Sequence, residues 1–374
     1  MDLRFTKEQQ QLQEEVRQFA VSRIASAIPA MEEEERFPTG IIRLMAEREW
    51  MGIPIPKQWG GAGKDFISYI VAINEISRVS AAVGVILSVH TSVCTLPILN
   101  YGTDEQREHF VGKLAAGEWL GAFALTEPHA GSDAGAIRTA AERKGDVYEL
   151  NGSKLFITNA GAAGVYLLFA VTDSSRRAGG ITAFLVPSNT EGLHIGKPER
   201  KMGLHGSNTC ELHLEQMRVP AEYRLGREGE GFAIAKGSLD GGRIGIAAQA
   251  LGLAEAALQL LKQQIPLPRG KLVTHRHSEL GELIARTAAA RLLVYRAASM
   301  YQEGRSCTKE ASMAKMFASD TAVAVSGAAV RLLGTPGISK SLPAERLFRD
   351  AKVTQIYEGT NEIHRIVISS RMMK

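Results

Sequence analysis

A single glutamate near the C-terminus stands in an unusual local sequence. Glu358 lies between Tyr357 and Gly359 in the stretch TQIYEGTNEIHR, and the apolar run KVTQIY precedes it. The Tyr-Glu-Gly-Thr corner should break a helix, so the carboxylate leaves the regular solvated face. Three interpretations are open: an accident of the surface, a cap, or a base kept away from water. The third requires burial, because burial raises the pKa of a carboxylate toward the working range of a base.

The stretch ALTEPHAGSDAG, residues 124–135, gathers hydrogen-bonding groups on a turn. It places Thr126, Glu127, Ser132 and Asp133 around a proline and glycines. Hydroxyls and bare backbone N–H groups on a rigid turn suit a flat ligand that is rich in hydrogen-bonding atoms. An ordinary loop would have the same composition, so composition alone leaves both interpretations open.

Other short patterns predict no chemistry. The histidines of HRH, residues 275–277, lack neighbouring cysteines or acidic residues, so we expect a solvated loop and no metal. GGAG (60–63) and GTPG (334–337) lack the lysine and serine of a phosphate loop, and we expect turns there. No serine or cysteine stands in a nucleophile elbow, so hydrolase and kinase functions find no support.

Composition describes an ordinary globular protein of two or three domains. The chain has 374 residues, 45% hydrophobic and 22% charged. Its formal charge of +4 is small and scattered, which argues against nucleic acid as a partner. The polar start MDLRFTKEQQ argues against a secretory segment there, and no apolar run approaches the ~18 residues of a membrane span. Three isolated cysteines (Cys94, Cys210, Cys307) fit a reducing cytoplasm.

The predicted secondary structure changes twice along the chain, from helices to strands and back to helices. Thr6 and Gln9 have capping-box spacing, and Leu12, Val16 and Phe19 follow at helical intervals. From about residue 121 short apolar runs predict strands, with a hairpin at Asn151-Gly152. GREGEGF (226–232) predicts a turn, and Ala/Leu-rich helices resume at about residue 236. We therefore predict a helical domain (1–120), a β-domain (121–235) and a helical bundle (236–374).

Four motifs resemble the acyl-CoA dehydrogenase family, in its order and at its spacing. They are AFALTEPHAGSDAG, LNGSKLFITNAGAA, LDGGRIGIAAQALGLAEAAL and LFRDAKVTQIYEGTNEIHR. The resemblance covers nearly the whole chain and is closest to the short-chain, butyryl-type members. It implies an N-terminal helical domain, a central β-barrel or sandwich, a C-terminal four-helix bundle, and FAD as cofactor.

The resemblance also implies roles for individual residues. Asp240 and Arg243 would position the substrate's pantetheine end together with Ser132, and Tyr357 and Gly359 would flank the base. The residues that would bind FAD are Phe123, Leu125, Thr126, Ser132, Phe156, Thr158, Arg331, Gly334 and Thr360. The family often has tryptophan where Phe156 stands; an aromatic ring is kept.

By the same resemblance Glu358 is the catalytic base. It would take the α-proton of an acyl thioester while hydride passes from Cβ to the flavin, giving a trans-2-enoyl thioester. The backbone N–H of the base would polarise the thioester carbonyl. Isovaleryl-type and long-chain-type members place their base just before the arginine of the GR helix. That position is Gly242 here, so Glu358 must supply the base.

Two departures from the family fall at the distal end of the cofactor. The usual Arg-x-x-Phe-Gly motif is missing from the stretch that contains Pro266 and Pro268, and Gln-x-x-Gly-Gly-x-Gly is replaced by RLLGTPG, with Arg331 and Thr335. Three hypotheses follow: charge compensation by Arg331, Arg269 or Lys271, weaker FAD retention, or an altered dimer interface.

The predicted function is that of a short-chain acyl-CoA dehydrogenase of fatty acid β-oxidation. Its partners would be acyl-CoA and an electron-transferring flavoprotein, and its assembly a homotetramer built as a dimer of dimers. Two alternatives stay open: a dehydrogenase of an acyl group tethered to a carrier protein, and a binding or scaffold relative that has lost its cofactor.

Overall fold

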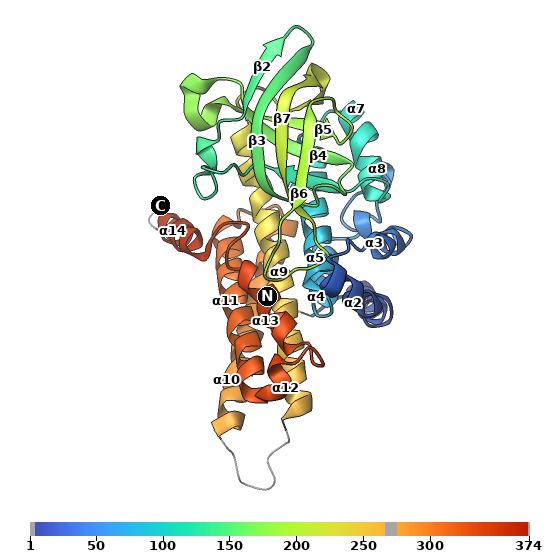
Figure 1. The fold of residues 1–374 in the computed structure, drawn as a ribbon, viewed down its shortest axis with the longest axis vertical. Helices are drawn as coiled ribbons and strands as arrows, with labels where there is room; N and C mark the ends of the chain where they lie inside the picture. Colours follow the sequence, from blue (N-terminus) through green and yellow to red (C-terminus); the bar gives the residue numbers. More distant parts are fainter. Residues whose placement is uncertain (1–3, 266–274, 373–374) are drawn as a thin grey trace.

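The computed structural model describes residues 4–265 and 275–372 in three regions. Helices come first, a β-sheet follows, and long helices close the chain (Figure 1). The helix α9 (Gly231–Gln264) runs from the sheet into the last bundle and links the regions. The predicted fold class is confirmed.

The N-terminal region begins with a capped helix. In α1 (Lys7–Phe19), the Thr6 hydroxyl accepts from the Gln9 N–H, and the Gln9 side chain accepts from the Thr6 N–H. The predicted capping box is therefore confirmed, and it satisfies two backbone donors that a bare helix end would leave free. The other α-helices of this region are α2 (Ala25–Glu34), α3 (Thr39–Ala46), α4 (Phe66–Ser77), α5 (Ala81–Ser88), α6 (Leu96–Tyr101), α7 (Asp104–Gln106) and α8 (Gly112–Ala115), and the π-helical turn Val89–Thr95 joins α5 to α6.

The sheet has the strand order β6-β7-β3-β2-β4-β5-β8, with β1 parallel to β4. Its two halves join through the single pair Ala140↔Val171 between β2 and β4. Tyr148 from one half packs on Phe184 from the other, with ring centroids 5.0 Å apart, so the halves face each other around their own core. The strands are β1 (Gly121–Ala124), β2 (Ala140–Lys144), β3 (Val147–Thr158), β4 (Val165–Val171), β5 (Ile181–Pro187), β6 (Leu193–Pro198), β7 (Thr209–Pro220) and β8 (Arg224–Leu225).

The predicted hairpin at Asn151-Gly152 is wrong. β3 runs straight through this pair, and the chain turns instead at Gly145-Asp146, between the paired residues Lys144 and Val147. The pair marks a β-bulge against β7, where the Asn151 side chain accepts from the Gln216 N–H at 2.8 Å. Glycine is needed for close approach, since a Cβ at Gly152 would lie 2.7 Å from Thr139 Oγ1.

Helix resumes earlier than predicted. The stretch GREGEGF was predicted to be a turn throughout, but α9 already begins at Gly231. A Cβ at Gly231 would lie 2.6 Å from the carbonyl carbon of Thr182 in β5. The glycine therefore lets the first turn of the helix pack directly on the sheet backbone.

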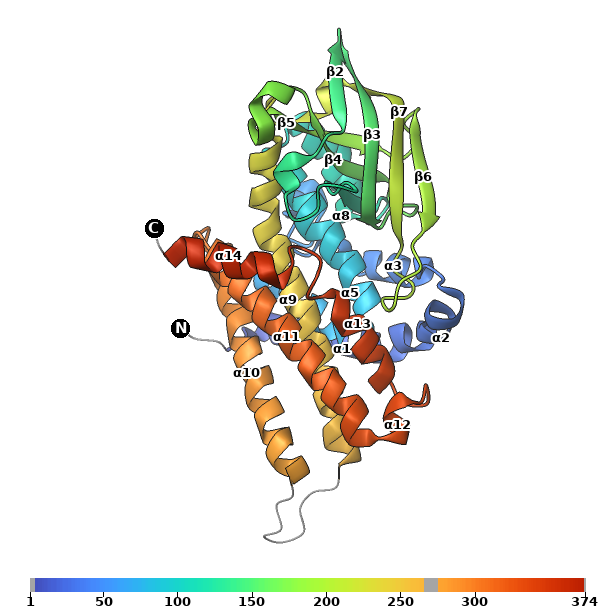
Figure 2. The same ribbon diagram turned by 60° about the vertical axis from the view of Figure 1, so that its left-hand side comes forward.

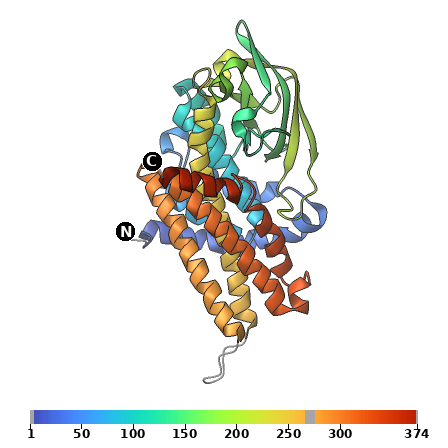
Figure 3. The same cartoon turned by 90° about the vertical axis from the view of Figure 1, so that its left-hand side faces the viewer.

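The C-terminal region is a bundle built on α9. α10 (His275–Gln302) and α11 (Thr308–Leu333) lie beside it, and α13 (Ala344–Val353) packs on α9 and α11 (Figure 2). Figure 3 shows α14 (Asn361–Met372) lying across the ends of α10 and α11 nearer the sheet. GTPG forms the short helix α12 (Thr335–Ile338) after Gly334, and HRH forms the first turn of α10, so both loop predictions are wrong.

The expectation that no segment has membrane-spanning length is also wrong. Three helical segments are long and apolar enough by length and composition: Ala81–Tyr101, Gly231–Gln264 and Thr308–Leu333. Small and hydroxyl-bearing residues interrupt their apolar runs without lowering the mean hydropathy much. The most apolar window is 94%, 89% and 44% buried in the three, respectively, so the first two serve the packing of this chain.

Candidate active site

Glu358 lies in the short link between α13 and α14, beside α9 (Figure 2). Its φ of 53° and that of Gly359, 91°, place both residues in the left-handed region. A glutamate pays a steric penalty of about 1 kcal/mol or more for this conformation. The corner predicted from the sequence therefore exists, and the surrounding structure holds it in a strained form.

The Glu358 carboxylate is partly enclosed and lacks partners. Its Oε2 atom is buried and accepts no hydrogen bond from the described residues. It lies against Gly242 of α9, where a Cβ would come within 2.7 Å of Oε2 and 2.7 Å of Val93. Burial raises the pKa of Glu358 to about 7, although the charges of Arg243 and Lys315 oppose the rise.

Tyr357 anchors the corner to α9. Its hydroxyl donates to Gln249 Oε1 at 2.5 Å, and the Gln249 amide donates to the Ala81 carbonyl at 2.8 Å. The ring is thus held between α9 and α5, immediately before the carboxylate. Tyr357 therefore limits how far Glu358 can move.

Asp240 and Arg243 form an ion pair on α9, and a third residue holds Asp240 in place. Arg243 donates to Asp240 Oδ1 at 3.3 Å, and the Thr308 hydroxyl donates to Asp240 Oδ2 at 2.6 Å. Arg243 Nε is buried without a partner among the described residues. The structure thus brings Asp240, Arg243, Tyr357, Glu358 and Gly359 together, as the sequence predicts.

The turn after β1 lies against the bulged end of β3. The Leu155 N–H donates to the Thr126 carbonyl at 2.9 Å, and the Lys154 ammonium donates to the Leu125 carbonyl at 3.2 Å. Phe156 sits in this bulge with φ 57°, and 59% of its surface is exposed. An exposed aromatic ring beside hydroxyls and backbone donors fits one face of a planar ligand.

Three of the other residues predicted around this ligand lie on the turn or on strands β1 and β3, and the fourth, Thr360, lies at the start of α14. Phe123 on β1 packs on Phe169, with ring centroids 5.0 Å apart, and Thr158 ends β3 opposite Thr209. Ser132 is exposed on the turn itself. The Thr360 hydroxyl accepts from the Ile363 N–H at 3.3 Å and caps α14.

Glu127 organises this turn, a role that the sequence did not predict. Its carboxylate accepts from the Arg138 and Thr139 N–H groups, the Thr139 hydroxyl and the Lys154 ammonium, at 2.5–3.0 Å. Burial by itself would raise the pKa of Glu127, but the Lys154 charge and these bonds leave it lowered. The signal was a glutamate between threonine and proline in a loop, where no helix face explains a charged residue.

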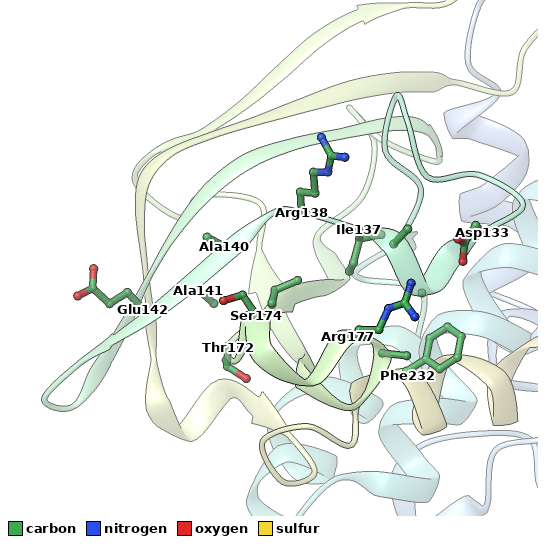
Figure 4. A pocket seen from close by; sticks show the side chains of 14 residues that line it. Asp133, Ile137, Arg138, Ala140, Ala141, Glu142, Thr172, Ser174, Arg177 and Phe232 are labelled. Atoms are coloured by element: carbon green, nitrogen blue, oxygen red, sulfur yellow. The ribbon is translucent and has the colours of Figure 1, made fainter.

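A cavity of about 860 Å³ opens next to the turn, between β2, β4 and the start of α9. Its lining residues include Arg138, Arg177, Asp133, Glu142 and Phe232 (Figure 4). Phe232 precedes Gly242 by ten residues on α9, which places the cavity about 15 Å from the Glu358 carboxylate along the helix. No sequence pattern predicted this cavity.

Arg331 and Gly334 lie elsewhere. Arg331 is in the last turn of α11, pairs with Glu279 of α10 and has a side chain 61% exposed. It follows Lys315, which contacts the Glu358 corner, by sixteen residues, about 24 Å along the helix. Within one chain these two residues therefore do not join the others. Pro266, Pro268, Arg269 and Lys271 lie outside the described residues.

Metal chemistry gains no support from the described residues. No group of three or more histidine, cysteine, aspartate or glutamate side chains in residues 4–265 and 275–372 could hold an ion. The candidate site consists of the Glu358 carboxylate with Arg243 and Lys315 near it, and of the turn beside the exposed Phe156 ring with the cavity next to it.

The chain belongs to the acyl-CoA dehydrogenase family. Family models match residues 6–118 as the N-terminal domain, 122–217 as the middle domain and 229–373 as the C-terminal domain.

Known proteins resemble this chain in both sequence and structure. An acyl-CoA dehydrogenase of Bacillus subtilis is 54% identical over 98% of each chain. Butyryl-CoA dehydrogenase from Megasphaera elsdenii matches with a TM-score of 0.96 and 42% identity over the whole of both chains. A chain in the structure of the electron transferring flavoprotein of Acidaminococcus fermentans matches with a TM-score of 0.97 and 42% identity, also over the whole of both chains.

Proposed function

We propose that this chain is a short-chain acyl-CoA dehydrogenase that oxidises an acyl-CoA to the trans-2-enoyl-CoA, with Glu358 as its base. The observation that carries the proposal is the Glu358 carboxylate itself, whose Oε2 is buried without a partner. A buried carboxylate without donors has a raised pKa and binds a proton well, which is what α-proton removal requires.

The residues fit FAD as the cofactor. The exposed ring of Phe156 and the backbone at Leu125 and Thr126 offer a flat, hydrogen-bonding surface to an isoalloxazine ring. Phe123, Ser132 and Thr158 lie on β1, the turn and β3 beside that surface, and Thr360 would add to it from the start of α14. When bound, FAD accepts the hydride that leaves Cβ of the substrate.

The chain's own groups handle the proton and the carbonyl. Glu358 takes the α-proton, so the substrate loses one proton and one hydride and gains one carbon–carbon double bond. The backbone N–H of Glu358 stabilises the charge that develops on the thioester oxygen, because the enclosed corner excludes water. Asp240 and Arg243 orient the thioester arm, and Tyr357 and Gly359 keep the base in place.

The cavity beside Phe232 suits the phosphate-bearing end of CoA. Arg138 and Arg177 line it together with the carboxylates of Asp133 and Glu142, and the two guanidinium groups could bind phosphate (Figure 4). α9 connects the cavity to Glu358, so an extended pantetheine arm would follow this helix. The acyl group would then end at Gly242 and Val93.

The partners follow from the same proposal. An electron-transferring flavoprotein would reoxidise the flavin, as the match to a chain in such a structure supports. The assembly would be a homotetramer in which Arg331 and Gly334 of a neighbouring copy meet the distal end of FAD, since they lie far from Glu358 in their own chain. The enzyme would lack a membrane span and work in the cytoplasm, where three free cysteines are stable.

An absorbance spectrum before and after anaerobic butyryl-CoA tests the proposal. Flavin bands that bleach with butyryl-CoA, and do not bleach in Glu358→Gln, would support it. Bands that respond only to a carrier-bound acyl group would favour the carrier-protein alternative. Absence of flavin even with excess FAD would favour the cofactor-free scaffold and overturn the dehydrogenase assignment.

A further inference from the structure

Lys315 of α11 is a buried cation directly beneath the Glu358 corner. It has no exposed surface, and its ammonium donates to the Gly359 carbonyl at 2.7 Å and to Asn361 Oδ1 at 3.1 Å. Burying an ammonium costs several kcal/mol unless nearby groups compensate. The other buried residues of α11 are alanines, serines, a threonine, a valine and a leucine, all uncharged, so packing alone gives no reason for a charged residue here.

The contacts of Lys315 belong to a network that fixes both ends of the corner. The Asn361 amide donates to the Ser319 hydroxyl at 2.9 Å and to Asp320 Oδ1 at 2.8 Å. Gln355, before the corner, donates to the same Asp320 oxygen at 2.6 Å. Asp320 thus holds the corner at Gln355 on one end and at Asn361 on the other, and the Lys315 bond to Gly359 adds a contact between these ends.

Gly359 is the residue that most needs such a bond. With φ 91° and no side chain, it can rotate more freely than any neighbour, and it directly follows the base. Fixing its carbonyl fixes the exit of the chain from Glu358. The left-handed Glu358 is then held from one side by Tyr357 and from the other by Lys315.

The charged surroundings of Lys315 come from four elements. Glu358 faces it from the corner, Asp320 from its own helix, Arg243 from α9, and Glu362 and His364 from α14. Burial lowers the pKa of Lys315 to about 7, while Glu358 and Asp320 oppose the fall. Burial also lowers the pKa of His364 to about 3, so this ring is neutral. Below about pH 7 the Lys315 ammonium and the Arg243 guanidinium are therefore the cations near the base.

We propose that Lys315 is a positioning residue for the base: its bond to Gly359 holds Glu358 in the left-handed conformation, and its ammonium favours the carboxylate form of Glu358. The inference rests on the proposed role of Glu358. Lys315 thus contributes in two ways: its hydrogen bond to Gly359 sets the geometry of Glu358, and its charge sets the pH range in which Glu358 is ionised.

Three substitutions in the FAD-loaded enzyme separate these contributions. Lys315→Met removes the bond and the charge, Lys315→Gln keeps a donor without the charge, and Lys315→Arg keeps both in altered geometry. The control is Lys201→Met. Lys201 is half-buried and lies in the β-domain, and like Lys315 it donates to a backbone carbonyl, that of Ser207, at 2.8 Å. The measurement is kcat/KM for butyryl-CoA as a function of pH, with an artificial electron acceptor.

Loss of the ammonium should raise the pKa of Glu358, so the acid limb of the profile should move up by about one pH unit in the Met and Gln variants. Lys315→Met should also lower kcat by about 10–100-fold, and Lys315→Gln by less, because it still reaches Gly359. Lys315→Arg and Lys201→Met should keep the acid limb of the unmodified enzyme.

Two results would overturn the proposal. One is an acid limb that stays in place in both Lys315→Met and Lys315→Gln while thermal stability falls, which would make Lys315 merely structural. The other is equal movement of the limb in Lys201→Met. Glu358→Gln, run alongside, keeps the two claims apart: if that variant retains activity, the proposed base is wrong whatever Lys315 does.

Discussion

Two buried carboxylates, Glu127 in the β-domain and Glu358 in the bundle, each lie near a buried lysine, yet their surroundings are opposite. Glu127 accepts hydrogen bonds from four donors, including Lys154 at 2.7 Å, and its pKa is lowered. Glu358 leaves Oε2 without a partner, and its pKa is raised to about 7. Neither burial nor a nearby lysine therefore distinguishes a reactive carboxylate. The number of donors given to the carboxylate does.

The largest effect is expected from Glu358→Gln. The amide keeps the shape of the side chain but cannot take a proton, so kcat/KM for butyryl-CoA should fall by about 10⁴-fold. The variant should still fold, since Oε2 has no hydrogen bond to lose. Above about pH 7 it should be more stable than the original chain, because it removes a carboxylate whose ionisation destabilises the fold. If Glu358→Gln keeps more than a tenth of the activity, Glu358 is not the base, and the contrast between a reactive Glu358 and a structural Glu127 fails.

Glu127→Gln should act on stability instead. It leaves the Lys154 ammonium buried without its counter-charge, which costs about 3–5 kcal/mol of the free energy of unfolding. Urea denaturation measures the loss. The matched control replaces both partners, as Glu127→Leu with Lys154→Met, and should recover much of it because no buried charge remains. A single variant as stable as the original chain would mean that the Glu127 network contributes nothing.

The two carboxylates should also give stability opposite dependences on pH. The pKa of Glu358 rises on folding from 4.5 to about 7, so its ionisation destabilises the fold progressively between those values, by up to about 3 kcal/mol above them. The pKa of Glu127 falls below 4.5 on folding, so its contribution is complete above that value and is lost as the pH drops through the lowered pKa.

Comparing unfolding free energies of the original chain with Glu358→Gln and with Glu127→Gln across this range separates the two slopes. The difference from Glu358→Gln should change between pH 4.5 and about 7. The difference from Glu127→Gln should change only at lower pH. Slopes of the same sign in one window would contradict the contrast between the sites.

Sequence reasoning recovered what depends on local spacing. The capping box at Thr6 and Gln9 and the corner at Glu358 both follow from neighbours within a few residues. The family resemblance added the order of domains and the residues around the base.

The missed features depend on tertiary pairing. Lys315 reaches Gly359 across 44 positions, and Lys154 reaches Glu127 across 27. Nothing local distinguishes these lysines from solvated ones until the elements pack. The hairpin at Asn151-Gly152 failed for the same reason, since the course of β3 is set by β7 and by the approach of Thr139.

The smallest effect is expected at Gly242, which tests whether the Glu358 carboxylate must keep its place. A Cβ at this position would lie 2.7 Å from Oε2 and from Val93, so Gly242→Ala must displace the carboxylate. A shift of about 1 Å should lower kcat about 10²-fold without changing the donors around Glu127. The control is Gly281→Ala in α10, where a Cβ meets no atom within 4 Å, and it should leave kcat unchanged because alanine also favours the helix. Equal kcat values for the two variants would show that Glu358 tolerates displacement, and the contrast with the rigidly bonded Glu127 would then rest on hydrogen bonding alone.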